Sequence, residues 1–194
     1  MCAVFWSDGW IDAPLLPFDT PITVCDGCTC IFWLDEAEVL GTIAQSGPRV
    51  NPEWMFARPV RNLIHDEYHD AIHSACWRDR DHELLLRHLT WQSVNGPFRD
   101  REHPRLVELV DDDIENVDAL RRLLRLTADL DRLLLVDIAR QRGEFDEAER
   151  LLAVKMSEEY SDVARQMRRW VEKGDRRLLP FRWGEESATT SGTD

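Results

Sequence analysis

The residues of this chain best suited to chemistry are cysteines and histidines, and the first group is a run of three thiols. Cys25, Cys28 and Cys30 lie within six residues of one another. Cys25 and Cys28 have the Cys-X-X-Cys spacing with which a tight turn presents two thiolates to one tetrahedral metal ion. Gly27 is expected to give this turn its conformational freedom. Because a structural zinc site needs four ligands, this segment, the Cys knuckle (residues 25–30), supplies half of one.

The second group follows at helical spacing. His65, His69 and His73 recur at every fourth position, and Cys76 falls on the same stripe. Two histidines four residues apart on a helix form a good metal-binding pair. The predicted zinc ligands are therefore drawn from Cys25, Cys28, Cys30, His65, His69 and Cys76. Two alternatives are a metal-free hairpin with a solvated histidine edge, and a redox role for the thiols.

These residues match known catalytic motifs only in part. The run from His65 to His69 resembles the His-Glu-X-X-His of zinc proteases, but Asp66 stands where the glutamate base belongs. The His-Asp pairs also resemble those of helical metal phosphohydrolases, which need an earlier histidine, and none precedes His65. The sequence contains no Gly-X-Ser-X-Gly, phosphate loop or Gly-X-Gly-X-X-Gly. We therefore expect a protein that is not an enzyme.

Composition restricts the partners. The 194 residues include 37 acidic and 24 basic side chains, a formal net charge of -13. Binding to nucleic acid or to an anionic membrane draws on a basic surface, so neither is expected. No apolar run approaches the roughly 18–20 residues that span a bilayer, and residues 1–10 do not read as a signal peptide. These features predict a cytoplasmic protein with a protein or peptide partner.

The elements that position these residues differ along the chain. Residues 21–25 and 31–34 read as two strands flanking the Cys knuckle. Asp35 is a plausible N-cap for a helix that contains Val39 and Leu40. The apolar periodicity after the Pro-rich connector predicts helices over 60–76, 82–95, 104–110, 112–127, 130–142, 144–156 and 159–173. The predicted segments are a knuckle module (1–47), a helical hairpin (48–102), a helical region (103–183) and a disordered tail (184–194).

One predicted helix carries a polar stripe. Its members are spaced four residues apart and are Glu83, Arg87, Trp91 and Asn95, and Arg99 follows at the same spacing beyond the helix. Our interpretation is that Trp91 is buried while Glu83 and Arg87 pair at its rim, since tryptophan on a helix is usually part of a core. The alternative is a recognition stripe.

Two motifs resemble known families. Gly143-Glu-Phe-Asp-Glu-Ala148 resembles the turn between the helices of a tetratricopeptide repeat, in which a small residue lets the helices approach closely. The Cys knuckle with Phe32-Trp33 resembles that of rubredoxin and zinc ribbons, although Asp26 and Thr29 replace their proline and glycine. The order of these motifs resembles that in a group of uncharacterised bacterial proteins, from which no activity follows.

The predicted fold is mainly α, a helical bundle with a tetratricopeptide-like hairpin and a small N-terminal β-hairpin module. The predicted function is that of a non-enzymatic interaction or scaffold protein, which binds a protein or peptide through its helical region. The alternative is a zinc-binding protein or metal-dependent enzyme that uses the Cys25/Cys28 and His65/His69 groups. An acidic mimic of nucleic acid is a third hypothesis, which requires the carboxylates to gather on one face.

Overall fold

A computed structural model describes residues 3–13, 20–41 and 58–182. The chain forms two compact units, which we treat separately. The sheet unit is Pro17–Leu86, and the helical unit combines Met1–Leu16 with Arg87–Asp194. The boundary falls within helix α2 (Arg80–Asn95). The fold is mainly helical, as predicted, with small antiparallel sheets. Within the described ranges, no helix is both long and apolar enough to span a membrane.

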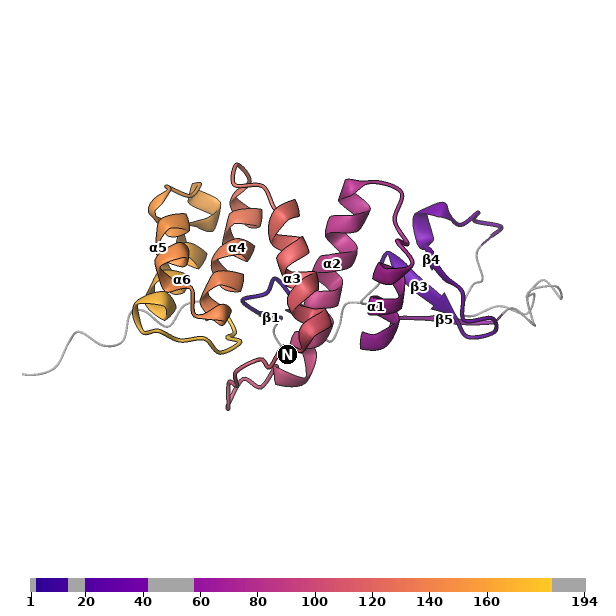
Figure 1. The fold of residues 1–194 in the computed structure, drawn as a ribbon, viewed down its shortest axis with the longest axis horizontal. Helices are drawn as coiled ribbons and strands as arrows, with labels where there is room; N and C mark the ends of the chain where they lie inside the picture. The colour runs from indigo at the N-terminus through magenta and orange to yellow at the C-terminus, as the bar shows by residue number, and fades with distance from the viewer. Residues whose placement is uncertain (1–2, 14–19, 42–57, 183–194) are drawn as a thin grey trace, which may run out of the picture. The chain divides into compact units, whose positions relative to one another are not determined.

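The sheet unit is built on a three-stranded antiparallel sheet (Figure 1). Its strands, in the spatial order β4-β3-β5, are β3 (Ile22–Cys25), β4 (Ile31–Trp33) and β5 (Val60–Arg61). Ile22 and Val24 on β3 are fully buried, which gives this unit its core. The predicted hairpin around the Cys knuckle is confirmed, whereas β5 occupies residues predicted to be helical.

Strand β5 explains why helix α1 (His65–His73) is shorter than the predicted helix over 60–76. Val60 and Arg61 pair with β3, so the helix cannot begin before the chain leaves the sheet. The Glu67 carboxylate then caps the first turn by accepting the Ile64 backbone N–H at 2.9 Å. At the other end the chain leaves the helix through Ala75, whose φ of +50° is left-handed.

The helix predicted from Asp35 is also wrong. Only one 3₁₀ turn forms there, η1 (Leu34–Glu36). Val39 and Leu40 are 86% and 74% exposed, so a helix at this point would bury no apolar face, and such burial supplies most of a helix's stability. The Asp35 carboxylate accepts a hydrogen bond from the Arg78 guanidinium at 2.7 Å instead of capping.

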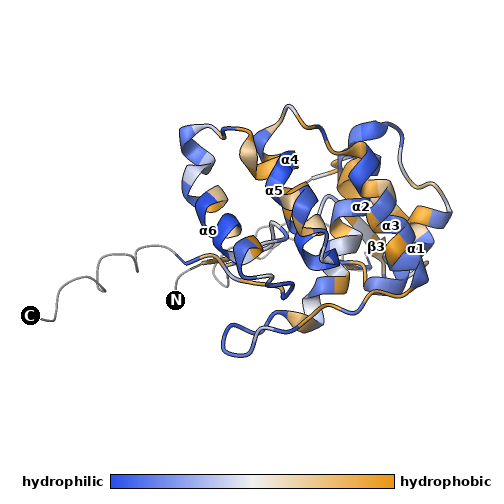
Figure 2. Ribbon diagram, turned by 60° about the vertical axis from the view of Figure 1, so that its left-hand side comes forward, coloured by the Kyte–Doolittle hydropathy of each residue, from blue (hydrophilic) through white to orange (hydrophobic). Residues whose placement is uncertain are grey.

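The helical unit combines a two-stranded sheet with a layer of helices. The strands are β1 (Val4–Phe5) and β2 (Ile11–Asp12), and the helices are α3 (Asp111–Leu123), α4 (Asp129–Arg142), α5 (Phe145–Ala153) and α6 (Ser161–Glu172), with short 3₁₀ turns η3 (Gly96–Phe98) and η4 (Glu158–Tyr160). Helix α4 contacts α3, α5 and α6, and every residue from Arg132 to Arg140 is buried. Hydrophobic and hydrophilic segments alternate along α5 and α6 (Figure 2). Because it is buried and contacts three other helices, α4 is the core element of this unit.

Helices α4 and α5 form a tight hairpin at the predicted turn. Gly143 has a φ of +79°, a left-handed conformation that favours glycine, and ends α4 as predicted. The turn is closed by the Glu144 N–H, which donates to the Ala139 carbonyl at 2.8 Å. Ala148 is fully buried. The likeness of this hairpin to a tetratricopeptide repeat stays a prediction.

The short helix predicted over 104–110 does not form. The Arg105 carbonyl accepts a hydrogen bond from the Leu178 N–H at 3.1 Å, so this stretch is held to a distant segment. Helix α3 begins after Val110, whose N–H donates to the Asp113 carboxylate at 3.2 Å. The predicted disordered tail (184–194) lies outside the described residues, and the boundaries predicted for the other segments stay a prediction.

Candidate functional site

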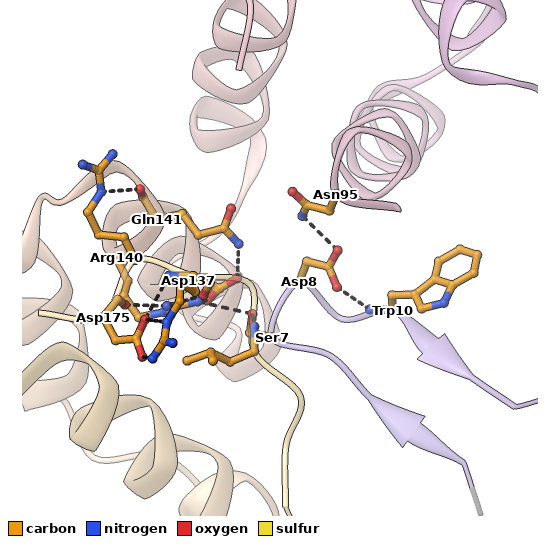
Figure 3. Close-up of polar contacts among 11 residues, drawn as sticks. Ser7, Asp8, Trp10, Asn95, Asp137, Arg140, Gln141 and Asp175 are labelled. Atoms are coloured by element: carbon orange, nitrogen blue, oxygen red, sulfur yellow. Dashed lines mark hydrogen bonds and ion pairs between the residues drawn. The ribbon is translucent and has the colours of Figure 1, made fainter. Parts of the chain in front are cut away.

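The N-terminal strands of the helical unit are joined by a turn that buries a carboxylate. Asp8 is fully buried, and its carboxylate accepts three hydrogen bonds, of which Figure 3 draws those from Asn95 and Trp10. One oxygen accepts the Asn95 side-chain amide at 2.9 Å and the Arg99 guanidinium at 2.5 Å. The other oxygen accepts the Trp10 backbone N–H at 3.1 Å. Asp8 thus fixes the main chain of Trp10 to the end of α2 and to the segment that follows it.

The backbone carbonyl of Asp8 is also engaged. It accepts hydrogen bonds from the His88 imidazole at 2.9 Å and from the Gln92 side-chain amide at 3.2 Å. Burial lowers the pKa of His88, which keeps the ring neutral and able to donate one N–H to this carbonyl. Both residues lie on α2, so a single helix holds the turn at two points.

Arg99 connects this buried turn to the surface. Its guanidinium carbon lies 4.7 Å from the centroid of the Trp10 ring, within the range of a cation–π interaction. Burial lowers the pKa of Arg99, and the Asp8 charge opposes that effect. The Nε–H of Arg99 has no hydrogen-bond partner in the described structure. Arg99 is therefore a desolvated cation with one close carboxylate and one unused donor.

These residues line an open pocket of about 460 Å³, which we call the Trp pocket. Its lining residues are Trp6, Trp10, Asp12, Arg99, Asp100, Arg101, Glu102 and Arg105. Trp6 is buried beneath it and Trp10 is half-buried, with its ring extending away from Asp8 in Figure 3. Among the residues that the structure describes, the lining offers indoles, guanidiniums and carboxylates but no thiol, hydroxyl or imidazole.

A second buried charge pair binds Ser7, which lies in the same turn as Asp8. The Arg140 guanidinium donates to the Asp137 carboxylate at 2.5 Å, and both side chains are fully buried. The same guanidinium donates to the Asp175 and Arg177 carbonyls at 2.5 and 2.7 Å, and to the Ser7 hydroxyl at 3.3 Å (Figure 3). Burial raises the pKa of Asp137, and Arg140 offsets part of that rise. Helix α4 thereby anchors residues next to Trp6 and Asp8.

A larger pocket, of about 600 Å³, lies at the turn between α4 and α5. Most of its charged side chains form ion pairs with neighbouring side chains. The Glu144 carboxylate lies 2.8 Å from the Arg121 guanidinium and 2.9 Å from that of Arg142, and Glu147 pairs with Arg150.

The Cys knuckle, in the sheet unit, has the hydrogen bonds of a compact turn. The Gly27 N–H donates to the Cys25 sulfur at 3.3 Å, and the Thr29 N–H donates to the Cys25 carbonyl at 2.8 Å. Thr29, not Gly27, takes the left-handed conformation, with a φ of +58°. Gly27 is needed for another reason, since a Cβ there would lie 2.7 Å from the Cγ of Arg58. Cys25, Cys28 and Cys30 are free thiols, and the last two are exposed.

The remaining predicted ligands lie on and after α1. The His65 and His69 rings meet edge to face with centroids 4.8 Å apart, and the His69 and His73 centroids are 6.3 Å apart. Cys76 is half-buried, and burial raises the pKa of its thiol. Among the described residues, no cluster of three ligating side chains includes any of the four cysteines, Cys25, Cys28, Cys30 or Cys76. The zinc site that combines knuckle cysteines with helix histidines stays a prediction.

The polar stripe of α2 contributes more than the sequence indicated. Trp91 is 1% exposed, so its predicted burial is confirmed. Asn95 and Arg99 bind Asp8 and shape the Trp pocket, which sequence reasoning missed. The local signal for that turn is Ser7-Asp8-Gly9-Trp10, but nothing in it identifies partners almost ninety residues away. No family model, curated protein or solved structure matches the chain.

Proposed function

We propose that the protein is a non-catalytic binding protein whose helical unit holds a short segment of a protein partner in the Trp pocket. The observation that supports this proposal is the Trp10–Arg99 stack, anchored from below by the buried Asp8. Tryptophan and arginine are the residues most enriched where protein interfaces concentrate their binding energy. Here both stand at the edge of a concave surface.

The pocket is already organised for binding. The main chain of Trp10 is fixed by Asp8, and its ring is covered on one side by the Arg99 guanidinium. Arg105 donates to the Pro97 carbonyl at 3.1 Å, which orients its side chain along the rim. Side chains that are ordered before association lose little conformational entropy on binding. A partner side chain can therefore dock without first paying for the order of the site.

The chemistry of the lining indicates the kind of segment that fits. The indoles favour a bulky apolar side chain, and the rim carries both signs of charge, Arg101 and Arg105 beside Asp12 and Glu102. Backbone N–H groups of His103 and Glu102 lower the pKa of Asp100. Asp100 therefore stays an ionised acceptor at neutral pH and is poorly suited to general acid catalysis. The best match is an apolar residue flanked by polar ones in an extended peptide.

The test is selection from a random-peptide library displayed on phage, with the full chain as bait. We expect enriched peptides that share a bulky apolar residue. Their affinity should fall roughly 30-fold in Trp10→Ala, the loss expected from an interfacial residue worth about 2 kcal/mol. Arg105→Ala should weaken them less, and Arg150→Ala, in the α4–α5 pocket, should leave them unchanged.

Two results would contradict the proposal. One is a selection that enriches no common sequence. The other is a set of peptides that bind wild type, Trp10→Ala and Arg105→Ala with equal affinity. Circular dichroism of each variant separates a lost contact from a lost fold, since Trp10 is only half-buried and its removal should leave the helices intact.

A further inference from the structure

The Cys knuckle takes no part in the Trp pocket, and its geometry carries a separate inference. We propose that Cys25 and Cys28 form half of a tetrahedral Zn²⁺ site, and that a second copy of this chain supplies the other half through the same two residues. The metal then links two chains. This site is independent of the peptide-binding function proposed above.

The turn is arranged for thiolates. The Gly27 N–H points at the Cys25 sulfur, and such a donor stabilises the negative charge that a metal-bound sulfur carries. Thr29 is held at a φ of +58°, which is strained for a β-branched residue. Backbone strain that the surrounding structure maintains is typical of functional turns. The strain here closes the turn through the Thr29 N–H and the Cys25 carbonyl.

The turn is also supported on both sides. Strand β3, which ends at Cys25, pairs with β4 on one side and β5 on the other. The Asp26 N–H donates to the Pro59 carbonyl at 3.1 Å, and its carboxylate lies 3.0 Å from the Arg61 guanidinium. A metal would therefore meet two cysteines whose backbone is already fixed, at little cost in ordering.

In this proposal the second copy supplies the two ligands that the Cys25/Cys28 pair lacks. Structural zinc sites are closed by four protein ligands, and two thiolates leave two positions open. No cluster of three ligating side chains in the described parts of the chain includes a knuckle cysteine. Cys28 is exposed, so another molecule can reach it. A two-fold axis through the metal brings the same patch from two chains together, which is the usual symmetry of a dimer.

Charge is consistent with this arrangement. Each of the four thiols releases a proton as its bond to the metal forms, so Zn²⁺ with four thiolates carries two net negative charges. In each chain, Arg58 lies against Gly27 and adds a positive charge beside the knuckle, whereas Arg61 is already paired with Asp26 and Glu67. Arg58 thereby reduces the repulsion between two chains that are acidic overall.

The test uses Co²⁺, whose tetrahedral thiolate complexes absorb light, in titrations of the full chain under a reducing agent that does not bind metal. We expect the absorption to saturate at one Co²⁺ per two chains, with a doubling of the mass measured by light scattering. Cys28→Ser should abolish both effects, and Zn²⁺ should displace Co²⁺. Cys76→Ser, outside the knuckle, should leave both unchanged, as should Trp10→Ala in the Trp pocket.

The proposal is overturned if saturation needs one Co²⁺ per chain with the mass of a monomer, because the chain would then supply all the ligands itself. It is equally overturned if no thiolate absorption develops, or if Cys28→Ser retains the metal-dependent dimer. Cys28 is exposed, so its replacement by serine should not unfold the chain, and circular dichroism verifies this. Gly27→Ala, whose Cβ would meet Arg58, should weaken Co²⁺ binding without removing a ligand.

Discussion

The clearest test of the helical unit is Asp8→Asn, which removes one buried charge while keeping the size of the side chain. Asp8 is fully buried, and the Arg99 side chain is 11% exposed. The substitution leaves the Arg99 cation without its carboxylate partner. It also brings the N–H donors of the new asparagine close to the N–H donors of Asn95 and Arg99, which then lack an acceptor. Breaking a buried ion pair by removing one partner costs about 3–5 kcal/mol. Wild-type domains are stable by about 5–15 kcal/mol, so this is a large share.

The assay is equilibrium unfolding in urea, followed by circular dichroism at neutral pH. A matched control is Asp162→Asn, since the Asp162–Arg165 pair lies 2.8 Å apart on the surface of α6 with both side chains more than half exposed. That variant should change the free energy of unfolding by less than about 1 kcal/mol. The double variant Asp8→Asn/Arg99→Gln should recover part of the loss, because it no longer buries an unpaired charge. An Asp8→Asn variant as stable as the control would refute the reasoning.

Two further predictions concern the backbone and pH. Gly143→Ala places a side chain at a φ of +79° and should destabilise the chain by about 1 kcal/mol, measured as a lower Tm. Gly96→Ala is the control, because its Cβ would meet only the Arg99 guanidinium at 3.5 Å, and it should lower the Tm less. The Arg177 guanidinium lowers the pKa of Asp175 below its ordinary value. The ionised carboxylate therefore stabilises the fold at any pH above the unfolded-state pKa of about 3.9. This contribution is lost as the pH falls through the pKa of Asp175 in the folded protein. Asp175→Asn should therefore reduce the stability in urea at pH 7 and flatten its fall in acid, and equal pH profiles for the two proteins would contradict this.

The sequence predicted those elements whose signals are local. The β3–β4 hairpin follows from two apolar runs around a tight turn, and α3 to α6 follow from apolar periodicity and from glycines such as Gly143 and Gly174, both at positive φ. The burial of Trp91 follows from its place on an amphipathic helix. These features depend on residues within a few positions of one another.

Several of the errors share one cause, which is competition from distant segments. Val60 and Arg61 read as the start of a helix, but β3 offered them hydrogen bonds. The stretch after Pro104 reads as a helix, but Leu178 pairs with Arg105. The Trp pocket was missed for the same reason, because Asp8 binds residues 87 and 91 positions later, and a sequence pattern does not encode such pairs.

The anchoring of Ser7 has a consequence for how the chain is made. Its hydroxyl accepts the Leu179 N–H at 3.4 Å, across 172 residues, and Trp6 bridges to Pro180. At synthesis rates of about 5–20 residues per second, the first strand waits roughly 10–30 s after leaving the ribosome before its partner exists. During that wait, Trp6 and Ser7 lack the C-terminal segment with which they pair. The last part of the helical unit to be completed is therefore the first to be translated, so its N-terminal strand is the segment most dependent on protection from aggregation.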